Sequence, residues 1–310
     1  MTLKVGTRGS KLAVTQTGHV VAKMRGETEI VTITTQGDTD RSSLASIGGA
    51  GVFVSALREA LLAGEVDVIV HSLKDLPTAD FEGIELVAVT KREDARDVLC
   101  ARDGLTSNAL PEGAKVGTGS PRRAAQLREQ VPQVEVVDIR GNIETRLARV
   151  FGEDADLDAV VLAAAGLSRL ENTGHMSEHF ELSRVPTAPG QGALAIEVRS
   201  GDEAAKKAVR ALDHAITRAA VTAERRVLAG LEAGCSAPLG ATAIVDDGML
   251  FLTATAYALD GSHSVTASHA ATLDDLSPAS LQEAAIDVAD RAVAELFEGG
   301  AKELITEAAR

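Results

Sequence analysis

The stretch KVGTGSPRR, Lys115–Arg123, combines a short apolar strand, a glycine-containing turn and the start of a helix. The stretch KVGTRGSK, Lys4–Lys11, repeats this strand–turn–helix pattern near the beginning of the chain. Ser120 is expected as the N-cap of the later helix, because serine favours that position and proline favours the next one. A pattern used twice, each time with arginine beyond the strand, predicts two α/β units built on one plan.

Apolar runs typical of strands alternate with helical patterns through the first two-thirds of the chain. This alternation is typical of α/β folds with a largely parallel sheet. Helices are expected over residues 12–24, 53–63, 121–130 and 142–151. Strands are expected over residues 3–7, 29–35, 66–71, 84–90, 114–118, 134–139 and 157–166. The second α/β unit then covers residues 97–186.

The last third of the sequence follows another pattern. Proline and glycine interrupt residues 185–199, which form either a linker or a return strand. A long helical pattern covers about 202–231, and two Asp-Gly turns between alternating strands then predict a meander. A closing helix is expected over about 279–297, with Ser277 as its N-cap. We expect a separate small α+β unit over residues 215–310.

The composition limits the class of protein. Of the 310 residues, 45% are hydrophobic, which suits a chain with sizeable cores and more than one domain. The net charge of −14 and the low aromatic content (six Phe, one Tyr, no Trp) argue against a nucleic-acid partner. The sequence has no apolar run of membrane-spanning length, and its two cysteines have neither a disulfide nor a metal-ligand pattern. We therefore expect a cytoplasmic protein without a metal.

Arginines stand just beyond the expected strands. In the first turn of a helix, Arg122 and Arg123 each oppose the helix dipole by about 0.3–1 kcal/mol. Ligands of open α/β sheets bind beyond the carboxyl ends of the strands, where arginine suits carboxylate or phosphate. A nucleotide is disfavoured because GGAG, residues 48–51, lacks the Lys-Ser/Thr of a P-loop. Any one arginine has the alternative of a solvated surface position. The set that predicts an anionic ligand is Arg8, Arg122, Arg123, Arg140, Arg146 and Arg169.

The segment VDVIVHSLKDLP, residues 66–77, ends a buried strand with chemically active side chains. A carboxylate at Asp75, among arginines, can act as an acid or base or stabilise a developing cation. Lys74 can pair with this carboxylate or form a Schiff base. A charged turn before Pro77 is the structural alternative. His71, flanked by apolar residues, is expected to be structural.

The two cysteines differ in context. Cys100 lies in the apolar stretch DVLCA, where we expect an inert core thiol. Cys235 lies in LEAGCSAPLG, where Gly234, Ser236 and Pro238 indicate a loop. A loop thiol is more accessible and so more reactive than a buried one. No neighbouring histidine assists Cys235, and a free surface thiol is the alternative.

Seven motifs in order resemble the porphobilinogen deaminase (hydroxymethylbilane synthase) family, and together they cover essentially the whole chain. Each motif alone is moderately specific, whereas seven in the same order make a strong match. They are TRGSKLA (7–13), GEVDVIVHSLKDLPT (64–78), VGTGSPRRAAQL (116–127), IRGNIETRL (139–147), AAAGLSRL (163–170), PGQGALAIE (189–197) and LEAGCSAPLG (231–240).

The resemblance implies a fold and a reaction. Two α/β domains like type II periplasmic binding proteins would surround a cleft, and a small α+β domain would follow. The implied domains are residues 1–92 with about 190–212, residues 97–186, and residues 215–310. Family members hold a dipyrromethane cofactor through a thioether, and Cys235 matches the attachment cysteine. Four porphobilinogen molecules are deaminated and joined on this primer, and water releases hydroxymethylbilane. A monomer is implied, which passes its product to the next enzyme of porphyrin biosynthesis.

The resemblance also assigns roles to positions. Asp75 is implied as the catalytic residue, beside the cationic azafulvene-like species that forms when ammonia leaves. The acetate and propionate of each pyrrole ring would meet the arginines, with the Arg8–Ser10 turn facing the ligand from the first unit. The implied cofactor-binding residues are Cys235, Lys74, Ser10, Thr118, Ser120, Arg122, Arg123, Arg140 and Gly141. The implied substrate-binding residues are Arg8, Arg146, Arg169, Gln191 and Phe53.

The chain departs from the family pattern at four positions. Ala50 stands where GGKG has lysine, and Ser46 stands where a second lysine is often found. Gly119 and Pro121 replace the Ser and Leu of GTSSLRR. A non-catalytic module that binds a polycarboxylate is the alternative interpretation, although it gives no role to the third domain or to Cys235.

Overall fold

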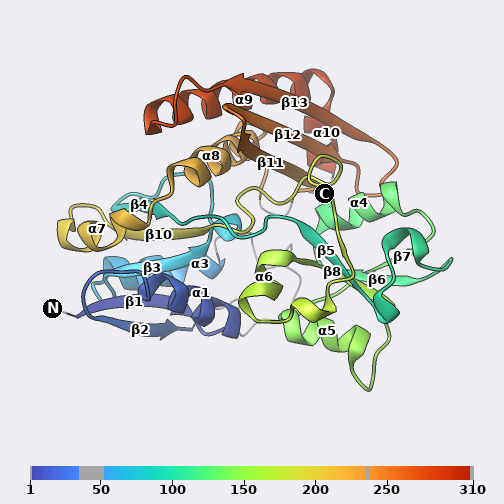
Figure 1. The fold of residues 1–310 in the computed structure, drawn as a ribbon, viewed down its shortest axis with the longest axis horizontal. Helices are drawn as coiled ribbons and strands as arrows, with labels where there is room; N and C mark the ends of the chain where they lie inside the picture. The colour runs from blue at the N-terminus through green and yellow to red at the C-terminus, as the bar shows by residue number, and fades with distance from the viewer. Residues whose placement is uncertain (1, 35–51, 235–236, 308–310) are drawn as a thin grey trace.

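The computed structural model describes residues 2–34, 52–234 and 237–307. These residues form two mixed five-stranded sheets and one three-stranded antiparallel sheet, with helices packed around them (Figure 1). The expected architecture of two α/β units followed by a smaller α+β unit is confirmed. Within the described ranges, no helix has both the length and the hydropathy needed to cross a lipid bilayer.

The first sheet has the strand order β2-β1-β3-β10-β4. Strand β1 is parallel to β2 and β3, whereas β10 runs antiparallel between β3 and β4. Residues 185–199 therefore contain a return strand, one of the two alternatives that the sequence left open. The strands are β1 (Leu3–Arg8), β2 (Thr28–Ile33), β3 (Val68–Ser72), β4 (Ile84–Val89) and β10 (Leu194–Arg199), and the helices are α1 (Lys11–Val21), α3 (Val52–Leu62) and α7 (Glu203–Val209).

The second sheet has the strand order β7-β6-β8-β5-β9. Strand β6 is parallel to β7 and β8, and β5 runs antiparallel between β8 and β9. The strands are β5 (Asp97–Ala101), β6 (Lys115–Thr118), β7 (Glu135–Asp138), β8 (Ala159–Ala163) and β9 (Glu178–His179), and the helices are α4 (Pro121–Gln130), α5 (Ile143–Phe151) and α6 (Ala164–Arg169).

The two sheets share one plan. In each, a strand that feeds a helix lies between two parallel partners: β1 between β2 and β3, and β6 between β7 and β8. In each, the next position holds an antiparallel strand, β10 in the first sheet and β5 in the second. The chain crosses from one sheet to the other between β4 and β5 and returns before β10 (Figure 1). The short stretch that occurs twice in the sequence, at residues 4–11 and 115–123, thus belongs to a strand arrangement that is repeated as a whole sheet.

The third sheet packs against long helices near the C-terminal end of the chain (Figure 1). Leu228 of α8 and Leu252 of β12 belong to one buried cluster with Val288 of α9. The two hairpin turns are confirmed, because β11, β12 and β13 pair in sequence order. The elements are β11 (Leu239–Asp246), β12 (Met249–Tyr257), β13 (Ser264–Thr272), α8 (Ala215–Gly230), α9 (Pro278–Glu298) and α10 (Ala301–Glu307).

The predicted N-caps are confirmed. Ser120 Oγ accepts a hydrogen bond from the Arg123 backbone N–H at 3.5 Å, and Pro121 opens α4. Ser277 Oγ accepts from the Ser280 N–H at 3.3 Å, at the start of α9. Each cap satisfies a backbone donor that has no partner inside its helix.

The single long helix expected over about 202–231 is wrong, because the structure divides it into α7 and α8. Between them, Asp213 and His214 adopt extended backbone angles. The Val89 N–H donates to Asp213 Oδ1 at 2.8 Å, and the His214 N–H donates to Val89 O at 2.9 Å. These hydrogen bonds to the end of β4 keep Asp213 and His214 out of a helix, because tertiary contacts commonly override local helix propensity.

Candidate functional site

A cavity of about 1040 Å³ lies between the two five-stranded sheets. Its wall includes the turn after β1, the segment after β3, the start of α5 and the beginning of α6 after β8. The carboxyl ends of β1, β3 and β8 therefore open into one space. This is the expected place for a ligand in sheets of this kind.

Most of the predicted site residues line this cavity. The first sheet and the loop before β10 contribute Arg8, Ser10, Lys74, Asp75 and Gln191. The second sheet contributes Arg123, Arg140, Gly141, Arg146 and Arg169. Thr118, Ser120 and Arg122 lie beside it without forming part of the lining. Cys235, Ser46, Ala50 and the side chain of Phe53 fall outside what the structure describes.

Two helices present their N-terminal ends to the cavity. The Ala13 N–H donates to Ser10 Oγ at 3.3 Å at the start of α1. The Thr145 N–H donates to Asn142 Oδ1 at 2.8 Å at the start of α5. The first turn of a helix carries a partial positive charge and attracts anions. Opposite walls of the cavity thus offer the same kind of electropositive end.

Arginines strengthen this positive character. Arg146 Nε donates to Gly141 O at 2.9 Å, and Arg169 Nη2 donates to Gly192 O at 2.7 Å. Burial, together with the nearby Arg123 and Arg140, lowers the pKa of Arg146 to about 10. Burial also lowers the pKa of Arg169. Arg146 stays cationic at neutral pH, and an anionic ligand would offset the repulsion between it and the nearby Arg123 and Arg140.

The segment after β3 forms a single 3-10 turn, η1 (Leu73–Asp75). Leu73 is fully buried and packs against Gly190, where a Cβ would lie 3.0 Å from the Leu73 Cγ. Gly190 also has a φ of +82°, which favours glycine. This close approach brings Gln191 beside η1, so that Lys74 Nζ donates to Gln191 Oε1 at 3.4 Å.

The surroundings of Lys74 shift the pKa of its ammonium group. Burial and then the charge of Arg123 lower the pKa of Lys74 to about 8. The carboxylates of Asp75 and Asp97 oppose this shift without cancelling it. Lys74 therefore remains largely protonated at neutral pH and loses its charge just above it.

The adjacent arginines at the start of α4 share a carboxylate of the protein itself. Arg122 Nη1 lies 2.8 Å from Asp97 Oδ2, and Arg123 Nη2 lies 2.6 Å from Asp97 Oδ1. Asp97 therefore offsets the unfavourable dipole interaction that the sequence had suggested a ligand would offset. Of the two arginines, Arg123 lines the cavity and Arg122 is turned away from it.

Sequence reasoning missed Asp97. The stretch DVLCA was recognised as an apolar strand, and every residue of β5 is buried. A carboxylate in a fully buried strand requires a charged partner. Applied to Asp97, this rule would have predicted a buried ion pair with a cationic side chain.

The structure gives a reason for glycine at position 119, one of the four positions where the sequence departs from the family pattern. A Cβ at Gly119 would lie 2.3 Å from Ile139 O, so a side chain cannot be accommodated without movement. The close approach joins the ends of β6 and β7, directly before Arg140. Glycine at this position thus helps to place an arginine of the cavity.

Two residues outside the proposed chemistry are held by the core. The thiol of Cys100 is buried, and burial raises its pKa to about 12, so the expected inert thiol is confirmed. His71 Nε2 lies 3.1 Å from Glu197 Oε2, and Glu197 also pairs with Arg58 at 2.6 Å. In residues 2–34, 52–234 and 237–307, no cluster of His, Cys, Asp and Glu could hold a metal ion.

Solved structures with a similar fold include periplasmic binding proteins. The methionine binding protein MetQ has a TM-score of 0.41 and 13% identity, covering 68% of this chain and 89% of that chain. An arginine-specific periplasmic binding protein of Salmonella typhimurium has a TM-score of 0.36 and 15% identity, covering 68% and 91%.

Two family models cover most of the sequence. "Porphobilinogen deaminase, dipyromethane cofactor binding domain" matches residues 3–207, and "Porphobilinogen deaminase, C-terminal domain" matches residues 218–300. A porphobilinogen deaminase of Leifsonia xyli is 62% identical over 97% of this chain and 94% of its own length. One of Thermobifida fusca is 49% identical over 99% and 96%. The chain therefore belongs to the porphobilinogen deaminase (hydroxymethylbilane synthase) family of tetrapyrrole biosynthesis, whose members have a dipyrromethane cofactor-binding domain.

Proposed function

We propose that this chain deaminates porphobilinogen and joins four such units into hydroxymethylbilane, on a dipyrromethane primer attached to Cys235. One observation carries the proposal within the family. A single cavity of about 1040 Å³ combines five arginines and Lys74 with one catalytic candidate, Asp75. Such a site suits a ligand with many carboxylates and a reaction that develops positive charge.

The donors of the cavity fit dipyrromethane. Each of its two pyrrole rings carries an acetate and a propionate, and guanidinium groups bind carboxylates through paired hydrogen bonds. Arg123, Arg140 and Lys74 would hold these carboxylates, with Ser10 and Gly141 adding neutral donors. When bound, the cofactor supplies a nucleophilic pyrrole carbon, and the protein orients it and excludes water.

Asp75 is proposed as the catalytic residue. Loss of ammonia from porphobilinogen leaves a cationic azafulvene-like species, which a carboxylate beside it stabilises. The same carboxylate can accept the proton that the new carbon–carbon bond releases. Arg8, Arg146, Arg169 and Gln191 would bind substrate and the growing chain from the two walls. The helix that carries Phe53 borders the same space.

Thr118 and Ser120 are proposed to act on the cofactor site through local geometry. The Ser120 N–H donates to Thr118 Oγ1 at 3.3 Å, and Ser120 Oγ caps α4. The turn thereby sets the direction of Arg123. Arg122 is proposed to support the same turn from behind the cavity wall.

The division of the chain follows the three sheets. We propose domains of residues 1–92 with about 190–212, residues 97–186, and residues 215–310, the last carrying Cys235. The order of strands supports this division, because β10 returns to the first sheet. A monomeric cytoplasmic enzyme that passes its product to the next enzyme of the pathway is proposed from the family.

Intact mass tests the proposal directly. Protein from cells that supply porphobilinogen should carry an adduct of dipyrromethane size that maps to Cys235. Cys235→Ser should lack the adduct and the turnover, and Cys100→Ser serves as the matched control that keeps both. An unmodified mass with no consumption of porphobilinogen would leave the non-catalytic binding module as the better interpretation.

A further inference from the structure

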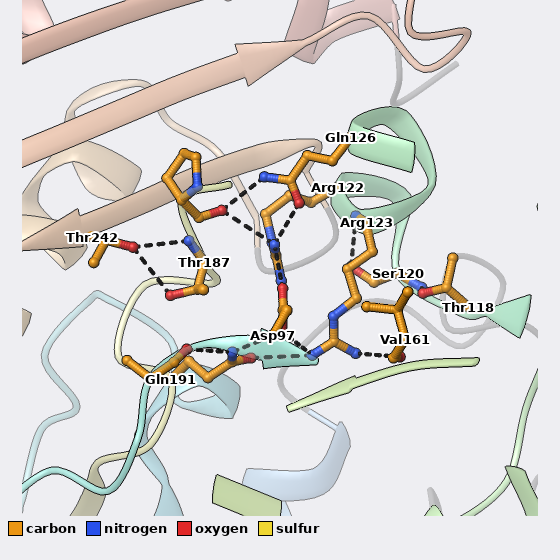
Figure 2. Close-up of polar contacts among 12 residues, drawn as sticks. Asp97, Thr118, Ser120, Arg122, Arg123, Gln126, Val161, Thr187, Gln191 and Thr242 are labelled. Atoms are coloured by element: carbon orange, nitrogen blue, oxygen red, sulfur yellow. Dashed lines mark hydrogen bonds and ion pairs between the residues drawn. The ribbon is translucent and has the colours of Figure 1, made fainter. Parts of the chain in front are cut away.

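Asp97 joins two adjacent arginines inside the molecule (Figure 2). It is the first residue of β5, and its side chain has no exposed surface. Its Oδ2 accepts from Arg122 Nη1 at 2.8 Å, and its Oδ1 accepts from Arg123 Nη2 at 2.6 Å. One carboxylate therefore uses a separate oxygen for each guanidinium group.

Arg122 extends from Asp97 toward the third sheet. Its Nη1 also donates to Gln126 Oε1 at 2.7 Å and to Pro186 O at 3.2 Å. Gln126 Nε2 in turn donates to the hydroxyl of Tyr257, in β12, at 3.0 Å. This branch fastens α4 to the third sheet and keeps Arg122 in the protein wall.

Arg123 extends from Asp97 toward the cavity. Its Nη1 donates to Val161 O at 3.3 Å, and its Nη2 donates to Gln191 Oε1 at 3.2 Å (Figure 2). Its Nε is buried and finds no hydrogen-bond acceptor among the described residues. Arg123, which is only 7% exposed, thus has one N–H without an acceptor in the described part of the protein, beside the cavity that it lines.

Gln191 is fixed by the same carboxylate. Its Nε2 donates to Asp97 Oδ1 at 2.8 Å and to Ala95 O at 2.7 Å. The amide therefore cannot rotate without losing both bonds, and its Oε1 faces Lys74 Nζ at 3.4 Å and Arg123. Asp97 thereby fixes the side chains of Arg123 and Gln191, and with them the hydrogen bond that Gln191 accepts from Lys74.

We propose that Asp97 is a positioning residue of the cavity, which holds Arg122 in the wall, aims Arg123 at the ligand's carboxylates and fixes Gln191 beside Arg123. The inference rests on the proposed function, because it requires a polycarboxylate ligand. Two like charges on neighbouring residues would otherwise separate, and a buried shared counterion holds both in defined directions.

The charge of Asp97 persists across the working pH range. Burial alone would raise the pKa of Asp97, but Arg122 and Arg123 outweigh burial and hold it well below its usual range. The alignment is therefore permanent and does not act as a pH switch. Its negative charge also raises the pKa of Lys74, against the effects of burial and Arg123.

Two variants, with and without compensation of the lost charge, distinguish a positioning role of Asp97 from a role in charge balance alone. Asp97→Asn removes the counterion and leaves both arginines, so we expect a lower melting temperature of the holoenzyme. Asp97→Asn with Arg122→Gln restores the original net charge of the cluster and should recover most of the melting temperature. In the double variant Arg123 and Gln191 still lack the carboxylate, so KM for porphobilinogen should stay raised about tenfold, the loss of one charge-assisted contact.

The kinetic result decides the inference. A double variant that recovers both melting temperature and KM would reduce Asp97 to a charge-balancing role and overturn the proposal. Asp97→Glu keeps the charge and moves the carboxylate by one methylene; if the double variant does not fold, an unchanged KM in Asp97→Glu overturns it instead. Asp290→Asn, at the exposed Arg226 pair, is the control with wild-type values. Wild-type holoenzyme that consumes no porphobilinogen would refute the proposed function rather than this role of Asp97.

Discussion

Arg92 and the fully buried Glu224 form a two-point ion pair, with Nη1–Oε1 and Nη2–Oε2 distances of 2.6 and 3.1 Å. Glu224 also accepts from the backbone N–H groups of Gly190 and Ala243, at 2.7 and 2.8 Å. Arg92 Nε donates to Gln191 O at 2.7 Å. This pair therefore links the crossing after β4, the loop before β10 and the third sheet.

Glu224→Gln should destabilise the protein strongly. The change leaves the largely buried charge of Arg92 without its partner, and breaking a buried pair costs about 3–5 kcal/mol. Urea unfolding monitored by circular dichroism would measure it. Asp290→Asn is the control, because the Arg226–Asp290 pair is exposed and should contribute at most about 1 kcal/mol. Equal losses in both variants would contradict the role given to Glu224.

Asp75→Asn should lower turnover by about a hundredfold or more, because it removes the carboxylate that we propose stabilises the cation and accepts the proton. The side chain is half-buried at the cavity, so the melting temperature should change little. Steady-state assays with porphobilinogen and circular dichroism measure the two effects. Asp80→Asn, at an exposed position five residues on, is the control. Turnover near the wild-type value would remove Asp75 from the mechanism.

Two arginines of α5 offer a matched comparison. Arg146 lines the cavity, whereas Arg149 on the same helix pairs with Asp156 at 2.8 Å. Arg146→Gln should raise KM for porphobilinogen about tenfold through the loss of a charge-assisted hydrogen bond. Arg149→Gln should leave KM unchanged. The same KM shift in both variants would point to a general effect on the helix.

The titration of Lys74 predicts an alkaline limit. Its pKa of about 8 lies below the ordinary 10.5, so the cation that we propose binds a carboxylate of the cofactor is present at neutral pH and is lost as pH rises through 8. Turnover of porphobilinogen on the attached cofactor should therefore fall above pH 8, and Lys74→Arg should move that fall to higher pH. Because the unfolded chain binds more protons in this window, the same titration favours the folded state as pH rises. Turnover that stays constant to pH 9.5, about 1.5 units above this pKa, would contradict the assignment.

Local patterns predicted local structure, and tertiary contacts account for what was missed. Ser120 and Ser277 were recognisable as N-caps because a cap depends on residues three positions away. The break at Asp213 was not, because its hydrogen-bond partner Val89 lies 124 residues away. Most of the predicted lining residues do line one cavity, since strand ends in parallel sheets converge whatever their separation in sequence.

The sequence also does not show which charged side chains pair when they lie far apart along the chain. Arg122 and Arg123 are visible as an electrostatic anomaly at a helix start, but the sequence does not show which anion compensates them. The answer is a residue of β5, a strand that joins its sheet antiparallel and so brings Asp97 next to α4. A buried carboxylate in an apolar strand is the clue that such a partner exists.

The repeated sheet plan has a consequence for a ligand made of like rings. Each of the two walls has a strand end, a capped helix start and an arginine beside it. Because these walls lie on opposite sides of one cavity, a ligand with carboxylates on more than one side meets the same type of donor on each wall.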